Sequence, residues 1–241
     1  SLFHPCNTTY FHFIFETVIY VFMIYKKYNL FELDRTKLPI FIIEKNKFNY
    51  ILTKIFKNIT LLTVNNRTGG SFWCKNLVLP EIKNYNYFHS WNREHIESNS
   101  DIYFINNDVI TEFKDTIKNM FVDNNINQKK YPVLVKRKSL FRYISEMNDL
   151  EIYLKKKFPN LKSVFLEDLD FVEQVKLFNN CNLLVLQAGS SFINTIFMPE
   201  NTHIICISVD NKFISSNFFK DISSISNKNL HWIKMPAKKE T

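Results

Sequence analysis

Short apolar runs alternate with helix-length segments through the second half of the chain, and this pattern constrains the fold most. The alternating strands and helices are expected at residues 131–135, 150–158, 164–166, 171–179, 183–186, 190–199 and 204–207. Strands that alternate with helices of about ten residues imply βαβ units and a parallel sheet. Trp232 and Ile233 are expected to close that sheet. Ligands of such sheets bind at the carboxyl ends of the strands.

The first half of the chain has the same α/β character. Helices are expected at 10–28 and 46–56, and strands at 38–43, 59–64 and 72–79. Residues 81–107 are polar and aromatic without periodicity, which indicates a connection between domains or an active-site loop. An amphipathic helix is expected at 109–122, with Ile110, Phe113, Ile117 and Phe121 on one face. We therefore expect an N-terminal domain over residues 1–107 and a C-terminal domain over 108–241.

The composition indicates a globular protein with an anionic partner. Of the 241 residues 46% are apolar, including 24 Phe, which excludes a disordered tail. There are 31 Lys and Arg against 23 Asp and Glu, and the net charge of +8 favours nucleotides, phosphosugars, nucleic acid or acidic membranes. The lysines are scattered and form no basic stripe, which argues against nucleic acid.

Neither a metal site nor a membrane span is expected. The four cysteines form no paired motif and have no histidine at ligand spacing; they are Cys6, Cys74, Cys181 and Cys206. The most apolar stretch, residues 10–25, is shorter than a span and contains His12 and Glu16. No targeting segment is recognised, so a cytoplasmic location is the default expectation, and the secretory lumen is the alternative if a targeting segment was removed. Because the chain begins at Ser1 in patterned sequence, we expect it to belong to a longer polypeptide.

Glycine is nearly absent, and one of the three glycines stands alone directly after an apolar strand. Gly189 follows Gln187 and Ala188 and precedes Ser190 and Ser191, which open a short helix that Pro199 stops. A strand, a glycine among small residues and a helix start build an anion pocket, because unpaired N–H groups of the first turn face the ligand. A tight turn without a ligand is the alternative.

Several ordered motifs resemble glycosyltransferase family 61. They are an acidic-Gln helix at Glu173-Gln174, the Gly189 turn, Asn194, the ending Phe197-Met198-Pro199, the basic segment 138–144, a His-Phe helix opening at His12, and the strand 74–80. The resemblance extends, with gaps, from about residue 7 to 208. It implies two Rossmann-like domains that face a cleft in the GT-B arrangement, with the nucleotide-sugar donor on the C-terminal domain and the acceptor mainly on the N-terminal one.

This chain departs from the family pattern at four positions. Lys138 stands in the register of the first arginine of the Arg-x-x-x-Arg pair, with Arg137 one position away. Gln187 replaces the histidine of the glycine turn, and Glu146 replaces an asparagine. Cys206 stands where an acidic residue is expected at the end of strand 204–207. These departures bear on which donor sugar is used and on whether the chain is fully active, and they leave the expected fold unchanged.

The resemblance also implies the donor-binding residues. They are Arg137, Lys138, Arg142, Glu173, Gln187, Gly189, Ser190, Ser191 and Asn194. Arg142, with Lys138 or Arg137, would neutralise charge on the leaving nucleoside diphosphate, so that no metal or further cofactor is needed. The alternative for the basic cluster is a solvated strand end. The acidic segment 167–170 is expected to be a helix N-cap region rather than a metal site.

Inverting transfer needs a general base, and Glu16 is the candidate. It follows His12 by one helical turn, so both side chains project from one face of an apolar helix. The alternative is a structural His12–Glu16 pair.

These inferences predict an inverting, metal-independent glycosyltransferase that moves a sugar from a UDP-sugar to a glycan or protein hydroxyl. The alternative is a non-catalytic nucleotide- or glycan-binding module that kept the fold, which Gln187 and Cys206 favour.

Overall fold

The structure, a computed structural model, describes residues 9–34, 38–64, 107–123, 129–138, 144–209, 211, 214 and 216–235. It divides into two compact units, Ser1–Phe113 and Lys114–Thr241. The strand expected at 72–79 and the connection from 81 to 106 lie outside the described residues.

The N-terminal unit begins with one long helical segment, as expected for residues 10–28. It consists of α1 (Tyr10–His12), the π-helical stretch η1 (Phe13–Val18) and α2 (Ile19–Lys27). The apolar face predicted from sequence is buried: Phe13, Val18, Val21 and Phe22 are at most 2% exposed. A π-helical stretch inside an α-helix is rare and is found frequently at functional sites.

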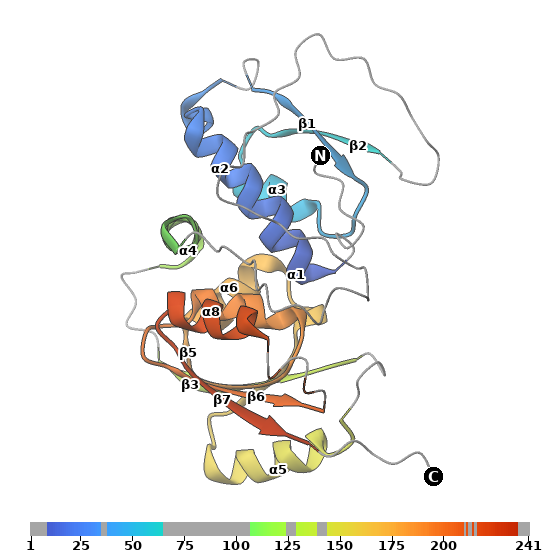
Figure 1. Ribbon diagram of the computed structural model, residues 1–241, viewed down its shortest axis with the longest axis vertical. Helices are drawn as coiled ribbons and strands as arrows, with labels where there is room; N and C mark the ends of the chain where they lie inside the picture. The colour runs from blue at the N-terminus through green and yellow to red at the C-terminus, as the bar shows by residue number, and fades with distance from the viewer. Residues whose placement is uncertain are drawn as a thin grey trace. The chain divides into compact units, whose positions relative to one another are not determined.

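A parallel βαβ unit follows this helix. The strand β1 (Ile40–Glu44) pairs in parallel with β2 (Thr60–Val64), and α3 (Tyr50–Ile55) connects them (Figure 1). The short 3-10 helix η2 (Leu30–Glu32) precedes β1. The core of this unit contains an aromatic cluster, in which the Tyr25 ring packs on the buried rings of Phe56 at 4.5 Å and Phe41 at 5.8 Å between centroids.

The helix α4 (Asn107–Phe121) crosses the division between the two units, which falls after Phe113. Its apolar positions Ile110, Phe113 and Ile117 are at most 1% exposed, as the sequence predicted. The Phe113 ring contacts Phe22 within the N-terminal unit, at 5.4 Å between centroids.

The C-terminal unit is built on a five-stranded parallel sheet. Its strands are β3 (Tyr131–Lys136), β4 (Lys162–Phe165), β5 (Cys181–Gln187), β6 (His203–Ser208) and β7 (Asn229–Lys234). They lie in the order β4-β3-β5-β6-β7, and every neighbouring pair is parallel. This confirms the parallel sheet and the closing role of Trp232 and Ile233, which lie in β7.

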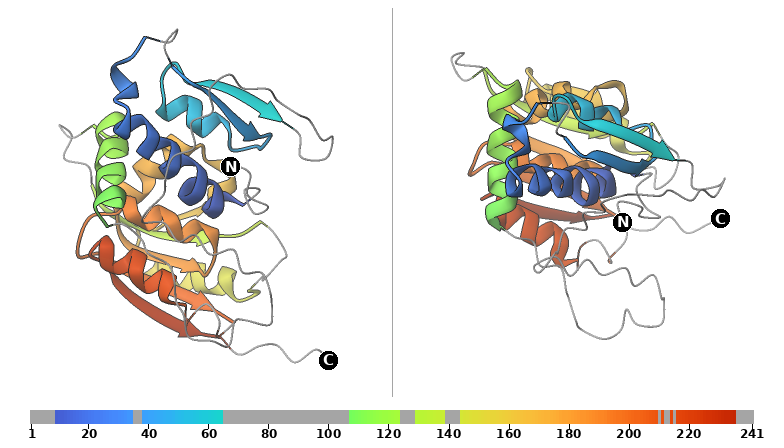
Figure 2. Two further views of the ribbon diagram at one scale, coloured as in Figure 1. Left: turned by 45° about the horizontal axis from the view of Figure 1, so that its top comes forward. Right: turned by 90° about the horizontal axis from the view of Figure 1, so that it is seen from above.

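Helices cover both faces of this sheet. α5 (Met147–Lys157) lies on one face, whereas α6 (Phe171–Asn179) and α8 (Asn217–Ile225) lie on the other (Figures 1 and 2). On the α5 face, Leu154 packs with Leu134, Val185 and Ile207 of the central strands. On the other face the Phe192 ring contacts Phe219 of α8 at 4.6 Å. The result is a three-layer α/β unit.

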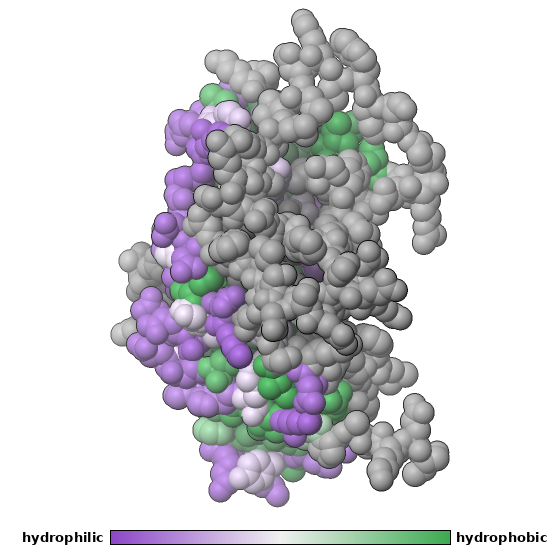
Figure 3. Space-filling model, in the orientation of Figure 1, coloured by the Kyte–Doolittle hydropathy of each residue, from purple (hydrophilic) through white to green (hydrophobic). Residues whose placement is uncertain are grey.

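The helix expected after Gly189 is present, and two features of this unit were not specified by the sequence. The segment after Gly189 is a 3-10 helix, η5 (Ser190–Phe197), which is wound more tightly than an α-helix. The helix α8 was not predicted from sequence. It is short, and its stability comes from the packing of Phe219 and Ile222, which are at most 5% exposed, rather than from its local sequence. Hydrophobic side chains also reach the surface among hydrophilic ones over the C-terminal unit (Figure 3), and Ile233 of the edge strand β7 is 45% exposed.

Candidate functional site

The strand order places a topological switch point between β3 and β5. From β3 the chain moves through α5 to β4 on one side, and from β4 it returns through α6 to β5 on the other side. Connections that diverge from neighbouring strands leave a crevice at their carboxyl ends, which is where open α/β sheets bind ligands. The residues that follow these two strands are Arg137 and the Ala188-Gly189 pair.

Arg137 and Gly189 meet at this point. The half-buried Arg137 donates a hydrogen bond from Nη2 to the Ala188 carbonyl oxygen at 2.9 Å. An ideal Cβ at residue 189 would lie 1.8 Å from the same Nη2. Gly189 has φ +158° and ψ −164°, a conformation found essentially only in glycine. The turn therefore needs a glycine for its backbone and for the close approach of the guanidinium.

The residues around Gly189 form the rest of the turn. Gln187 ends β5 and is 5% exposed, while the N–H group of Ala188 extends the sheet by donating to the Ile207 carbonyl oxygen at 2.8 Å. Ser190 and Ser191 are half-buried at the start of η5. The first bond of that helix joins the Phe192 N–H to the Gly189 carbonyl oxygen, so the two serine N–H groups precede it. This is the arrangement that accommodates an anion at a helix start.

Gln174 and Asn194 hold η5 against α6. The Asn194 Nδ2 donates to Gln174 Oε1 at 2.8 Å, and both residues are at most 6% exposed. Gln174 Nε2 in turn donates to the carbonyl oxygens of Leu166 and Leu169, at 3.0 and 3.1 Å. The buried amide of Asn194 therefore ties the 3-10 helix that follows the glycine turn to α6.

Two other proposed donor residues take part in contacts within the protein. Glu173 forms a capping box with Asp170: its Oε2 accepts from the Asp170 N–H at 2.7 Å, and its own N–H donates to Asp170 Oδ1 at 2.8 Å. This confirms the N-cap predicted in segment 167–170. The Lys138 side chain, 53% exposed, forms an ion pair with Asp168. Of the two candidate cations, Arg137 is therefore the one that the fold brings to Gly189.

The carboxyl end of β6 differs from the sequence expectation. The strand continues to Ser208, so Cys206 lies inside it, is fully buried and cannot stand at the strand end. Burial raises the pKa of the Cys206 thiol to about 12, although the nearby Arg137 charge lowers it slightly. Ser208, 3% exposed, is the residue at the end of β6, and its carbonyl oxygen accepts from the Met235 N–H at 2.9 Å. Sequence analysis missed it because the apolar run ends at Ile207.

The proposed catalytic residues are only partly described. His12 ends α1, is half-buried and contacts the Phe11 ring at 5.1 Å between centroids. Glu16 lies in the π-helical stretch η1, and its side chain lies outside what the structure describes. Arg142 also lies outside the described residues.

The described residues show neither a metal cluster nor a membrane span. No three His, Cys, Asp or Glu side chains in the described ranges gather closely enough to hold a metal ion. None of the helices in those same ranges combines the length and hydropathy that crossing a bilayer requires.

Comparison with known proteins connects this geometry to one family. The family model described as Glycosyltransferase 61 matches residues 10–205, which cover most of both units. Comparison with curated proteins finds no match.

Proposed function

The chain belongs to glycosyltransferase family 61, and on this premise we propose that it transfers a sugar from a UDP-sugar to a hydroxyl of a glycan or protein. The observation that carries the proposal is the meeting of Arg137 with the Gly189 turn at the switch point of the sheet. A nucleoside diphosphate carries the negative charge that an arginine and a helix start bind, and the carboxyl ends of the strands are where such sheets bind ligands.

The turn supplies two kinds of group for the diphosphate. The N–H groups and hydroxyls of Ser190 and Ser191 can donate to phosphate oxygens, and Arg137 supplies a planar cation with several donors. Arg137 can exchange its bond to the Ala188 carbonyl for a stronger charge-assisted bond to phosphate. Arg137 and Arg142 would then stabilise the charge of the leaving UDP, a role that a divalent metal has in other enzymes. We propose that the reaction needs no metal.

For the acceptor we propose that Glu16 is the general base of an inverting transfer, with His12 as its neighbour. The supporting observation is the π-helical stretch Phe13–Val18, which contains Glu16. A carboxylate on this helix is costly to bury unless it faces a polar group or a cleft. In this proposal, Glu16 takes the proton from the acceptor hydroxyl as the oxygen attacks the anomeric carbon and UDP leaves.

The test is isothermal titration of the full chain with UDP. We expect binding by the unmodified chain, a loss of about tenfold or more in affinity for Arg137→Ala, and unchanged binding for Lys176→Ala, an exposed lysine on α6. A chain that does not bind millimolar UDP would contradict the donor site. Release of UDP from a UDP-sugar then tests catalysis: Glu16→Gln should stop turnover and keep UDP binding.

A non-catalytic binding module is the second candidate, and the buried Gln187 favours it. Gln187 occupies the position of the family's histidine and cannot exchange a proton at neutral pH. UDP binding without any release of UDP from UDP-sugars, in the presence of glycan acceptors, would support this candidate instead.

A further inference from the structure

Two histidine rings meet on the surface of the C-terminal sheet. His203 is the first residue of β6, and His231 is the third residue of β7. The Nδ1 atom of His203 lies 3.1 Å from the Nε2 atom of His231, and the rings are stacked with their centroids 5.4 Å apart and their planes inclined by 22°. Both side chains are exposed. Two imidazole nitrogens therefore converge at one point that solvent reaches.

The register of the sheet fixes this pairing. The strands β6 and β7 are parallel neighbours, in which His203 pairs with Asn229 and Ile205 pairs with His231. Because side chains alternate between the two faces of a strand, His203, Ile205 and His231 lie on the same face. It is the face that α5 covers elsewhere, since Ile205 packs against the cluster that contains Leu154 of α5. Two regular strands, rather than a loop, thus hold the rings together.

The distance between the rings suits a shared metal ion. Without a metal the contact is a hydrogen bond in which one ring nitrogen donates and the other accepts, and such a bond contributes little where water can replace it. Zinc binds imidazole nitrogens at about 2.0–2.1 Å in tetrahedral geometry, which places two of them about 3.3 Å apart. The observed separation of 3.1 Å is close to that value, so only a small rotation of the rings is needed.

We propose that His203 Nδ1 and His231 Nε2 chelate one divalent transition-metal ion such as Zn²⁺. Each ring would carry its proton on the other nitrogen, so that both lone pairs face the ion. Imidazole suits zinc, copper and nickel, whereas magnesium and calcium prefer oxygen ligands. No third His, Cys, Asp or Glu in the described part of the chain joins the pair, so water occupies the remaining positions of the ion. The site is therefore open and exchanges its metal.

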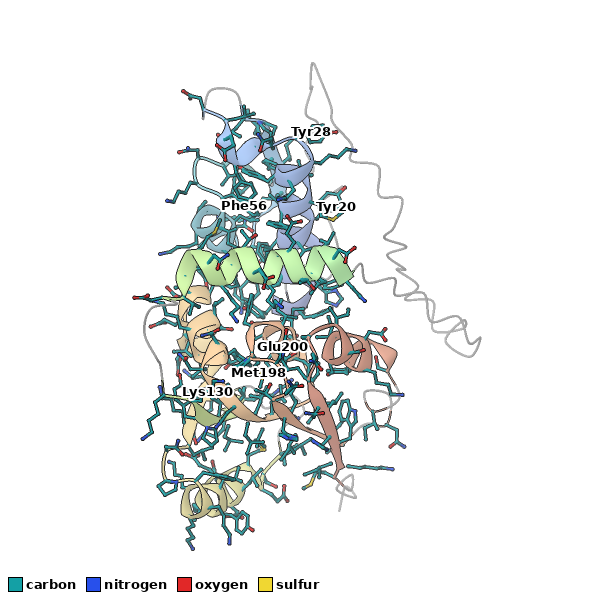
Figure 4. The ribbon with its side chains drawn as sticks, turned by 90° about the vertical axis from the view of Figure 1, so that its left-hand side faces the viewer. Tyr20, Tyr28, Phe56, Lys130, Met198 and Glu200 are labelled. Carbon is teal, nitrogen blue, oxygen red and sulfur yellow. The ribbon has the colours of Figure 1, made fainter. Side chains whose placement is uncertain are left out.

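The site is distinct from the proposed donor site. His203 pairs with Leu183 near the start of β5, whereas Gly189 follows the end of that strand. Because the strands are parallel, the histidine pair lies towards the opposite, amino-terminal edge of the sheet. Figure 4 labels two residues that precede strands at this edge: Lys130, directly before β3, and Glu200, three residues before β6. The metal has no part in the proposed sugar transfer.

A bound ion would also join two strands. In the sheet order β7 is an end strand, and β6 is its neighbour. An ion held by one histidine from each strand would fasten this edge strand to the sheet. Because the ion binds the native state, it should stabilise the fold by mass action.

The test is isothermal titration of the full chain with zinc chloride near neutral pH, with magnesium chloride as the comparison. We expect zinc to bind and magnesium not to bind. His203→Gln and His231→Gln should each lower zinc affinity by about tenfold or more, because one imidazole cannot chelate. His12→Gln, which removes a histidine of the N-terminal unit, is the matched control and should leave zinc affinity unchanged. Both sheet positions are exposed, so these variants should fold, which circular dichroism checks.

A second measurement is thermal unfolding with and without zinc. Zinc should raise the unfolding midpoint of the unmodified chain and should not raise that of the double variant His203→Gln/His231→Gln. Two outcomes would overturn the proposal: no heat of binding with millimolar zinc, or unchanged zinc affinity in the double variant. Titration of UDP into the double variant should give the affinity of the unmodified chain, which tests the donor site independently of this one.

Discussion

The guanidinium of Arg137 occupies the space that a side chain on Gly189 would need. Its Nη2 lies 1.8 Å from the ideal Cβ position of Gly189 and 2.9 Å from the Ala188 carbonyl oxygen. One residue follows β3 and the other follows β5, and the strands are neighbours in the sheet. The glycine and the arginine therefore function as a unit, and a change in either one alters the position of the other.

We predict that Gly189→Ala weakens UDP binding by about tenfold or more, because the new methyl group displaces Arg137. The strained backbone should also lower the free energy of unfolding by about 1–3 kcal/mol. Isothermal titration measures the first effect and urea denaturation the second. Ser224→Ala, at an exposed position of α8, is the control for a small change in a side chain away from the glycine turn. UDP affinity equal to that of the unmodified chain would show that Arg137 does not contact the donor.

We predict that Gln174→Leu and Asn194→Leu each lower the free energy of unfolding by about 1–3 kcal/mol, because each leaves a buried amide without its partner. The double variant should lose less than the sum of the two, since neither amide then remains. Urea denaturation of the unmodified chain, the two single variants and the double variant measures the coupling free energy between the two side chains. Strictly additive losses would mean that the 2.8 Å hydrogen bond contributes nothing to stability.

We predict a loss of stability in acid that depends on Glu151. Hydrogen bonds from Lys136 and then Lys155 lower the pKa of this carboxyl from 4.5 to about 2 in the folded chain. The group therefore stabilises the fold above its unfolded pKa, and this contribution is lost as the pH falls from 4.5 towards 2. Glu151→Gln should be less stable by about 1 kcal/mol at neutral pH and should lose less stability on acidification. Chemical denaturation at several pH values measures both, and parallel curves for the two proteins would refute the prediction.

We predict a dependence of the same sign for Lys228, in the alkaline range. Its pKa in the folded chain is about 8 against an ordinary value of 10.5, chiefly because of burial and then Lys114 and Lys118, with Glu200 opposing. Between these two values the unfolded chain holds a proton that the folded chain has released, so stability rises with pH.

The variant Lys228→Met should remove this rise and should be more stable near neutral pH by about 1 kcal/mol, because no buried charge remains. Denaturation of the two proteins in chloride, from neutral to alkaline pH, measures the difference. Lys220→Met is the matched control on an exposed surface. If Lys228→Met keeps the full pH dependence, another group is responsible.

Much of the secondary structure could be predicted from sequence. The helix at Phe171–Asn179 has the bounds that periodicity indicated, and its N-cap is the Asp170–Glu173 box expected in segment 167–170. Such features depend on residues a few positions apart, so a local pattern contains them. The 3-10 form of η5 and the helix α8 were not predicted, because packing against the sheet decides them.

The candidate site was predictable in its parts but not in its geometry. Gly189 and the basic residues after β3 were identified from sequence. The sequence did not decide that Arg137, rather than Lys138, lies beside the glycine. The end of β6 at Ser208, which places Cys206 inside the strand, was also missed. Neighbouring positions at the end of a strand point in different directions, so the register of the sheet decides which side chain reaches a ligand.

By itself the sequence determined the alternation of strands and helices, the glycine turn and the family, because local periodicity and ordered motifs contain that information. Only the tertiary structure decided which distant residues meet. Arg137 lies 51 residues from Ala188, and Asn194 lies 20 residues from Gln174. Strand order and packing bring such groups together, and neither can be derived from the local sequence pattern.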